Sequence, residues 1–316
     1  MSRLRIALVG CGDGARRHHL PLLRRTRGAE VVAVADPDAG CRAAALRHAP
    51  GALAMEDYRD AVAHPNVDAV VLCLPSALHA AAAVATLERR KPVYVEKPLA
   101  TTLADGARVL EAWRAAGVVG MIGFNYRFNP LYAAARRVVE DGRLGRIVAV
   151  RTVFTTAAGD LPAWKRRRDD GGGALLDLGS HHLDLVRWLL GESPVEVRAE
   201  LRSRASEDDT ALVQLRLASD VAVQSLFAFG AVDEERFEIY GDAGKLVVDR
   251  ARHQHVVIEG PTRRGRRWRR LVDAARTVAR APYVLEKRLV PGHEPSHRRA
   301  LARFVAAATR GTPVTP

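Results

Sequence analysis

Apolar runs alternate with amphipathic segments over the first 123 residues of the chain. Continuous apolar runs indicate strands buried on both faces, and apolar positions at helical spacing indicate helices between them. We expect strands at 5–9, 30–35, 69–74, 92–95 and 118–122, and helices at 15–27, 39–48, 76–90 and 103–116. Strands that alternate with helices predict a doubly wound α/β domain, whose parallel sheet is covered by helices on both faces.

The pattern changes after residue 123 to strands that follow one another. A helix at 130–140, a strand at 146–155 and an apolar helix that follows a glycine run and ends at 190 come first. Further strands are expected at 195–201, 210–217, 222–227, 236–240, 245–249 and 255–258, and a last helix at 296–310. Tight turns between successive strands predict a mostly antiparallel sheet. We therefore predict two domains, an α/β domain over 1–123 and an α+β domain with a large open sheet over 124–316.

Composition narrows the class of protein. The 316 residues are 48% hydrophobic and 27% charged, which is typical of a globular chain and excludes a disordered one. The uncharged stretch 69–87 has polar residues in its middle, and the N-terminal apolar run is too short for a signal peptide, so we expect a cytoplasmic protein with no membrane span. Three cysteines without paired spacing predict no disulfide, and we expect no metal site.

Basic residues are unevenly distributed along the chain. The formal charge is +13, and six arginines lie within Arg263–Arg270. Three interpretations of this segment stay open: a solvated loop, a docking site for an anionic substrate or membrane surface, and a nucleic-acid contact, which is the least favoured. A second basic run, Lys165–Arg168, directly precedes the glycine run, where Arg168 would suit a carboxylate or phosphate on the substrate.

A glycine-rich turn follows the first predicted strand. It consists of Gly10, Cys11, Gly12, Asp13, Gly14 and Ala15. Between a strand and a helix, this pattern is typical of a dinucleotide-binding site, because Gly10 permits a tight turn and Gly12 leaves room for a pyrophosphate. The helix that begins there offers unpaired N–H groups to the phosphates. The turn therefore predicts a nicotinamide dinucleotide cofactor.

Asp36 ends the second predicted strand, where a carboxylate can bind the ribose hydroxyls of the adenosine. The same carboxylate would repel a 2′-phosphate, which predicts NAD rather than NADP. One alternative is that Asp36 only caps the next helix. NADP also stays open, because Arg16, Arg17 and Arg24 are near in sequence.

Two further positions carry residues suited to proton transfer. Lys97 follows a predicted strand of the parallel sheet, where such folds present their catalytic groups, and a desolvated lysine there can serve as a base. Asp177 and His181 are four residues apart on the helix after the glycine run, so they share a face, and Asp184 lies three residues further on. A carboxylate that orients an imidazole is sound dehydrogenase chemistry.

In this order, the segments GCGDGA, LPSALH, VEKP, GFNYRFNP and GGGALLDLGSHHLDL resemble the Gfo/Idh/MocA oxidoreductase family. The resemblance covers essentially the whole chain. It implies an N-terminal Rossmann domain, a C-terminal domain with a large open sheet, and a substrate that is a sugar, a cyclitol or a derivative. It also implies a homo-oligomer formed through the C-terminal sheet.

The resemblance also implies roles for individual residues. The expected catalytic residues are Lys97, Asp177 and His181, the last chosen over its neighbour His182. The expected cofactor contacts beyond the glycine turn and Asp36 are Leu74, Pro75, His79, Glu96 and Lys97. The expected substrate contacts, besides Arg168, are Lys97, Asn125, Arg127, Asp177 and His181.

We therefore predict an NAD-dependent dehydrogenase or reductase that acts on a secondary hydroxyl or ketone of a sugar-like molecule, which could be anionic or nucleotide-linked. Two alternatives stay open. One is a catalytically silent protein that senses dinucleotide or sugar. The other is an enzyme that uses tightly bound NAD transiently, in isomerisation or glycoside cleavage.

Overall fold

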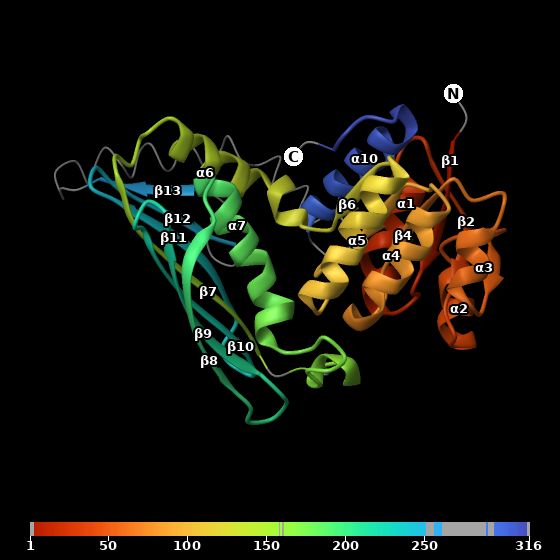
Figure 1. The fold of residues 1–316 in the computed structure, drawn as a ribbon, viewed down its shortest axis with the longest axis horizontal. Coiled ribbons are helices and arrows are strands. Elements are labelled where there is room, and N and C mark those ends of the chain that lie inside the picture. Colours follow the sequence, from red (N-terminus) through yellow and green to blue (C-terminus); the bar gives the residue numbers. More distant parts are fainter. Residues whose placement is uncertain are drawn as a thin grey trace. The chain divides into compact units, whose positions relative to one another are not determined.

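A computed structural model of the chain describes residues 3–157, 159, 161–250, 256–260, 289 and 294–314 (Figure 1). The described residues divide into two compact units. The first contains residues 3–128, 169–171 and 294–314, and the second contains the other described residues between 129 and 289. The basic segment Arg263–Arg270 and the start of the strand predicted at 255–258 lie outside the described residues.

A six-stranded parallel sheet forms the centre of the first unit, in the order β3-β2-β1-β4-β5-β6. Its strands are β1 (Leu4–Val9), β2 (Ala29–Ala35), β3 (Leu53–Met55), β4 (Ala69–Leu72), β5 (Val93–Val95) and β6 (Gly120–Ile122). Its helices include η1 (Ala15–His19), α1 (Leu20–Arg25), α2 (Ala39–Leu46), α3 (Tyr58–Ala63), η2 (Ser76–Leu78), α4 (His79–Glu88), α5 (Leu103–Ala116) and η3 (Asn125–Phe128). The predicted doubly wound sheet is confirmed. Its strand order reverses between β1 and β4, the position at which such sheets bind ligands.

Both faces of this sheet are buried. Ile6 and Leu8 of β1 pack into one apolar cluster, whereas Ala7 and Val9 pack into another. Neighbouring side chains of a strand point to opposite faces, so a strand covered on both sides is apolar throughout. By contrast, β3 lies at the sheet edge with Leu53 about half exposed, so it lacks this signal. Neither β3 nor α3 was predicted from the sequence.

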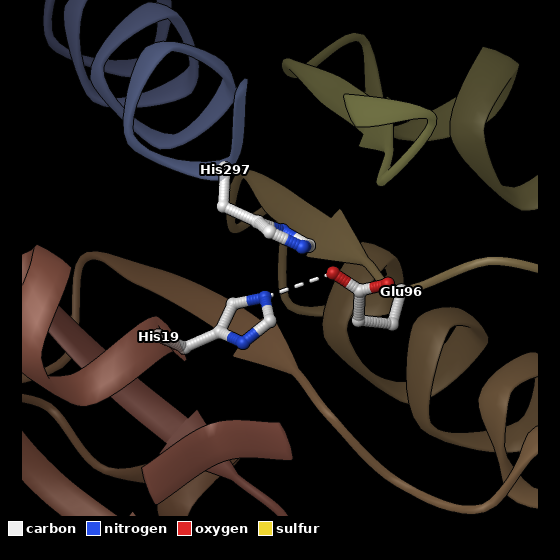
Figure 2. A group of neighbouring side chains, drawn as sticks. All are labelled: His19, Glu96 and His297. Atoms are coloured by element: carbon white, nitrogen blue, oxygen red, sulfur yellow. Dashed lines mark hydrogen bonds and ion pairs between the residues drawn. The ribbon is translucent and has the colours of Figure 1, made fainter. Parts of the chain in front are cut away.

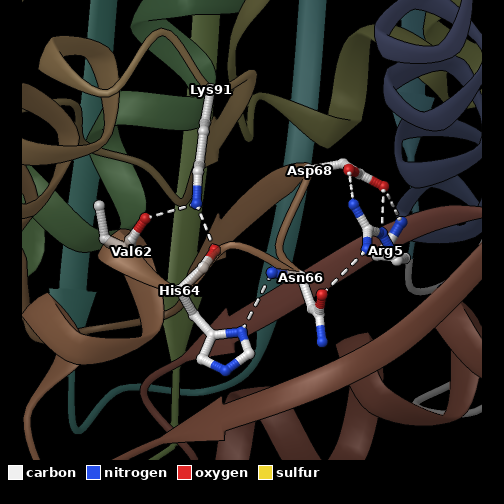
Figure 3. A network of polar contacts seen from close by, with 6 residues as sticks. All are labelled: Arg5, Val62, His64, Asn66, Asp68 and Lys91. Carbon is white, nitrogen blue, oxygen red and sulfur yellow. Dashed lines mark hydrogen bonds and ion pairs between the residues drawn. The ribbon is translucent and has the colours of Figure 1, made fainter.

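A polar network joins elements at the amino ends of β1 and β4 (Figure 3). Arg5 forms a two-pronged ion pair with Asp68, at 2.6 and 3.0 Å. The guanidinium of Arg5 holds the pKa of the Asp68 carboxyl below its ordinary value. Lys91 donates to the carbonyls of Val62 and His64 at the end of α3, where a cation also offsets the helix dipole.

The last helix, α10 (Pro295–Arg310), belongs to the first unit. Its apolar face, which includes Leu301, Phe304 and Val305, packs into the same cluster as Ile6 and Leu8 of β1. Figure 1 shows α10, in blue, beside α1. We expected this helix in the second domain, and that prediction was wrong, because an amphipathic pattern reveals the buried face of a helix but not the partner against which it packs.

The second unit contains a seven-stranded sheet in the order β13-β12-β11-β7-β10-β9-β8. Its strands are β7 (Ile147–Thr156), β8 (Pro194–Arg202), β9 (Thr210–Leu217), β10 (Ala222–Phe229), β11 (Glu234–Gly241), β12 (Lys245–Asp249) and β13 (Val256–Glu259). Among these described strands the neighbours are antiparallel except β7 and β10, which confirms a mostly antiparallel sheet.

Helices α6 (Pro130–Glu140) and α7 (Ser180–Leu190) lie along one face of this sheet (Figure 1). Two short helical segments, η4 (Ala163–Arg166) and η5 (Leu175–Gly179), precede α7. In β9 the side chains alternate between buried and exposed, as expected for a sheet with one covered face. In the described part of the chain, no helix combines the length and the hydrophobicity that a membrane span requires.

Candidate active site

The glycine turn after β1 has the shape that a phosphate-binding turn requires. Gly10 has a φ of +86°, and a side chain there would overlap the carbonyl of Cys73 after β4. A Cβ at Gly12 or Gly14 would meet no protein atom within 4 Å, so the space in front of the turn is open. Ala15 is buried, and the π-helical segment η1 begins there. Such segments are frequent at functional sites.

Asp36 follows β2 and contacts this turn directly. Its carboxylate accepts the N–H of Cys11 at 2.7 Å and the N–H of Asp38 at 2.9 Å. The cap of α2 is Asp38, which accepts the N–H of Cys41, so the alternative that Asp36 merely caps this helix is wrong. Asp36 thus stands between the glycine turn and the end of β2, where an adenosine ribose binds in such folds.

Two of the three arginines that kept NADP open, Arg16 and Arg17, have a carboxylate partner in the glycine turn. Arg16 and Arg17 both form ion pairs with Asp13, at 2.7 and 3.0 Å. Arg42 of α2 donates to the carbonyls of Asp36 and Pro37. These contacts favour NAD over a cofactor with a 2′-phosphate.

His79 ties together the loops that follow β4 and β5. It is fully buried, and its two ring nitrogens contact the carbonyls of Pro98 at 2.6 Å and Leu74 at 2.8 Å. Burial lowers the pKa of His79, and the two carbonyl contacts oppose that shift. The Lys97–Pro98 bond that it supports is cis. His79 therefore connects the loop at Leu74 with the segment that contains Lys97 and Pro98.

Glu96 follows β5 and is held as a carboxylate. Burial by itself would raise the pKa of Glu96, but the hydrogen bond from His19 and the nearby cationic groups hold it far below its ordinary value. The His19 Nε2–Glu96 Oε1 distance is 2.8 Å, and the N–H of Lys97 donates to Oε2 at 3.2 Å. The half-buried Lys97 is therefore anchored at the carboxyl end of β5.

In the second unit, the glycine run places the helix that carries Asp177 and His181. A side chain at Gly172 would overlap the carbonyl of Lys165, and Gly173 has a φ of +95°. The carbonyl of Lys165 accepts the N–H of Gly173 at 3.1 Å, so η4 packs on the start of this helix. Like the helix after the first glycine turn, it begins with a π-helical segment, η5.

Asp177 lies in η5 and forms an ion pair with Lys165, in which the Nζ of Lys165 is 2.7 Å from the Oδ2 of Asp177. His181 is half-buried, with its ring centroid 6.5 Å from that of Phe154. Both side chains stand on one helix, as the spacing predicts. The ion pair with Lys165 was not predicted, because nothing in the basic run distinguishes Lys165 from the three arginines that follow it.

His182, next in the chain, has the surroundings of a core residue. It is fully buried between the rings of Phe154, Phe227 and Phe237, at centroid distances of 5.4, 5.9 and 5.6 Å. Burial lowers the pKa of His182 to about 3, so the imidazole is neutral at physiological pH. These contacts leave His181 as the histidine of this pair that suits proton transfer.

Two of the other predicted substrate contacts, Arg168 and Asn125, have partners within their own units. Arg168 forms a two-pronged ion pair with Asp208, with both distances 2.6 Å. Asn125 is buried and donates from Nδ2 to Ser296 of α10 at 2.7 Å, which gives it a structural role. Arg127 is half-buried in η3. The substrate roles of these residues stay predictions.

A Rossmann unit with an open glycine turn, an acidic residue after β2 and a lysine after β5 defines a dinucleotide-dependent oxidoreductase. The chain belongs to the Gfo/Idh/MocA family: residues 4–124 match the oxidoreductase family with an NAD-binding Rossmann fold, and residues 132–247 match the GFO/IDH/MocA C-terminal domain. The predicted family, fold class and assignment to NAD-binding oxidoreductases are confirmed.

Related proteins and a similar solved structure support this assignment. Inositol 2-dehydrogenase of Acidothermus cellulolyticus is 34% identical over 86% of this chain and 81% of its own length. The dTDP-3,4-didehydro-2,6-dideoxy-alpha-D-glucose 3-reductase of Streptomyces violaceoruber is 33% identical over 78% of this chain and 73% of its own. An oxidoreductase domain protein from Kribbella flavida has a similar structure, with a TM-score of 0.83 and 25% identity over 100% of this chain and 92% of that one.

Proposed function

We propose that this protein oxidises a secondary hydroxyl of a sugar or cyclitol with NAD, or reduces the corresponding ketone. The observation that carries the proposal is the set of proton-transfer residues: Lys97 after β5, and Asp177 with His181 on the glycine-opened helix. The relatives named inositol 2-dehydrogenase and dTDP-sugar 3-reductase act on ring carbons that bear hydroxyl or keto groups, which suggests the substrate class.

The residues of the first unit fit NAD. The turn at Gly12 and Gly14 faces open space, and the Asp36 carboxylate stands beside it to receive the ribose hydroxyls. The residues that would hold the rest of the dinucleotide are Leu74, Pro75, His79, Glu96 and Lys97. When bound, NAD supplies the nicotinamide that accepts or donates a hydride.

Lys97 and His181 both take part in proton transfer at the substrate oxygen in the proposed reaction. The Nζ of Lys97 binds the substrate oxygen and takes its proton as the alcohol becomes a ketone, and returns it in the reverse direction. The imidazole of His181 binds the same oxygen and shares that proton transfer. Asp177, which forms an ion pair with Lys165, orients the imidazole. The mechanism requires Lys97 and His181 to reach one hydroxyl.

The charges near the helix favour an uncharged substrate. Asp177 neutralises Lys165, and Asp208 neutralises Arg168 through two hydrogen bonds. Because these cations already have carboxylate partners, a sugar or cyclitol without phosphate is the better match. A nucleotide-linked sugar, as in the dTDP-sugar reductase, is the second candidate.

One experiment separates the dehydrogenase from the two alternatives. The purified protein is mixed with NAD⁺ and a panel of inositols, hexoses and anhydrosugars while nicotinamide absorbance is followed. We expect NADH to accumulate with at least one polyol, and the Lys97→Met variant to lose this signal. Nicotinamide that is bound as purified and is reduced without net NADH release would indicate transient redox chemistry. No reduction with any polyol, at saturating dinucleotide binding, would indicate a sensor.

We also propose that the chain assembles as a homo-oligomer through the sheet face that carries Leu212 and Leu226, which are paired across β9 and β10. Leu212 is 41% exposed. Light scattering after size exclusion would test this: Leu212→Arg should reduce the mass, whereas Val232→Arg, at an exposed valine outside the strands, should not. A monomeric parent protein would contradict the proposal.

The cytoplasmic location and the lack of a nucleic-acid partner stay predictions from composition.

A further inference from the structure

Three side chains with metal-binding atoms converge in the first unit. His19, Glu96 and His297 each offer a ligand atom, and these atoms lie within 4.8 Å of one another. Figure 2 shows the rings of His19 and His297 and the carboxylate of Glu96 turned toward a common point. The three residues come from η1, the end of β5 and the first turn of α10. No metal site was expected from the sequence, and no local spacing connects these three residues.

The surrounding structure fixes each of these side chains. His19 is buried, and its Nδ1 faces the carbonyl of Gly14 at 3.4 Å, so Nδ1 carries a proton toward that carbonyl, and Nε2, which donates to Glu96, is the atom that can become a metal ligand once its proton leaves. In a metal-binding histidine, the ring nitrogen that does not bind the metal usually donates its N–H to a backbone carbonyl or a carboxylate, which fixes the orientation of the ring. Only Nε2 of His19 therefore points into the cluster.

The start of α10 holds His297 against the same carboxylate. Glu294 caps this helix by accepting the N–H of Ser296 at 3.0 Å, and Asn125 donates to the Ser296 hydroxyl. The ring of His297 stacks on His18 at a centroid distance of 5.0 Å and meets His19 edge-on at 5.7 Å. Two imidazoles are thus directed at one carboxylate by packing that is independent of any ligand.

We propose that His19, Glu96 and His297 bind a divalent transition metal, with zinc as the best match. Two imidazole nitrogens and one carboxylate oxygen are a common zinc ligand set, with a fourth position left for water. Calcium and magnesium prefer sets made of oxygen ligands alone. Tetrahedral zinc with bonds of about 2.1 Å places its ligand atoms roughly 3.4 Å apart. Ligand atoms that lie up to 4.8 Å apart therefore need to approach by about 1.4 Å at most, whereas the His19–Glu96 pair at 2.8 Å needs to separate slightly.

Binding would replace the hydrogen bond between His19 and Glu96. The proton of that bond leaves to solvent when zinc takes its place, since ligand nitrogens must be deprotonated. The bound ion would join η1, β5 and α10, which lie far apart in the sequence. Zinc should therefore raise the thermal stability of the protein, because a ligand that binds only the folded state stabilises it.

The test measures metal binding directly and needs neither NAD nor substrate. The full-length protein is first stripped of metal with a chelator. One sample is titrated with Zn²⁺ in competition with a chromophoric chelator. A second sample is titrated with Co²⁺ while its visible spectrum is recorded. We expect one equivalent to bind, with a cobalt spectrum typical of four-coordinate N and O ligands, and a higher melting temperature with zinc. The matched variants are His297→Gln in the cluster and His48→Gln outside it.

His297→Gln should weaken zinc binding by more than about 100-fold, because loss of an outer-shell partner alone costs about 10–100-fold. It should also abolish the zinc-dependent rise in melting temperature, whereas His48→Gln should change neither. Glu96→Gln is a second cluster variant. Absence of stoichiometric binding, or equal binding by both histidine variants, would overturn the proposal and leave a hydrogen-bonded cluster. Dehydrogenase activity does not enter this test, so either proposal can fail alone.

Discussion

At the scale of single residues, side chains of one type have opposite roles because their contacts differ. Asp36 touches the glycine turn, whereas Asp38 two residues later only caps a helix. His181 is half-buried on the helix that carries Asp177, whereas His182 is enclosed by three phenylalanine rings. The role of each of these side chains therefore depends on the atoms that surround it, whereas the sequence gives only the residue type.

Asp36 should set the preference between dinucleotides. Removal of its carboxylate in Asp36→Ala takes away both the ribose acceptor and the repulsion of a 2′-phosphate, so the preference for NADH over NADPH should shrink. Fluorescence titration of both nucleotides measures this preference. Equal or tighter binding of NADPH by the unmodified protein would contradict the role of Asp36.

His182 should make stability fall in mild acid. Its pKa is lowered to about 3 in the folded protein, whereas an unfolded chain has the ordinary value of 6.5. Above pH 6.5 the residue is neutral in both states. As the pH falls below 6.5 the unfolded state takes up a proton that the folded state does not, which costs up to about 1.4 kcal/mol per pH unit until about pH 3.

The variant His182→Phe isolates this contribution. Urea unfolding of both proteins at pH 7 and pH 5 should show that the parent loses about 2 kcal/mol more than the variant over this interval. Phenylalanine suits the aromatic surroundings and cannot be protonated. Equal losses in the two proteins would show that His182 is not the group responsible.

At the scale of elements, the glycines of the turn after β1 have different roles. Gly10 is required by its backbone, since φ is +86° and a side chain would overlap the Cys73 carbonyl. Gly14 has helical dihedrals, with a φ of −59°, and faces open space. Gly12 and Gly14 therefore keep room for a ligand, whereas Gly10 shapes the fold.

Alanine in place of Gly14 and alanine in place of Gly10 should have opposite effects on stability. Gly14→Ala should raise the free energy of unfolding by about 0.5–1 kcal/mol, the usual gain of alanine over glycine in a helix. Gly10→Ala should lower it by more than 1 kcal/mol, because alanine cannot adopt the required φ without strain. Denaturant unfolding without cofactor measures both. Equal effects of the two changes would contradict this division.

At the scale of the whole molecule, the proposed reaction needs residues from both units. Lys97 belongs to the first unit, and Asp177 and His181 belong to the second. Lys97→Met or His181→Asn should lower kcat by about 10²–10⁴-fold, the usual contribution of a positioned acid–base group. Dinucleotide affinity should change much less. A variant with near-normal turnover would remove its residue from the mechanism.

The sequence by itself determined the features that local patterns encode. The apolar β1 followed by Gly10, the acidic end of β2, and the four-residue spacing of Asp177 and His181 all follow from neighbouring residues, as did the family. The boundaries of α5 and α6 were also correct to the residue. Burial on both faces and helical periodicity are visible in short stretches of chain, which is why these predictions succeeded.

Only the tertiary structure decided which distant residues meet. It placed α10 on the core of the first unit, Lys165 on Asp177, Arg168 on Asp208, and His297 beside His19 and Glu96. An amphipathic face or a charged side chain can pack against many complementary partners, and local sequence does not choose among them. That choice belongs to packing of the whole core, which brings together residues up to 278 positions apart, as with His19 and His297.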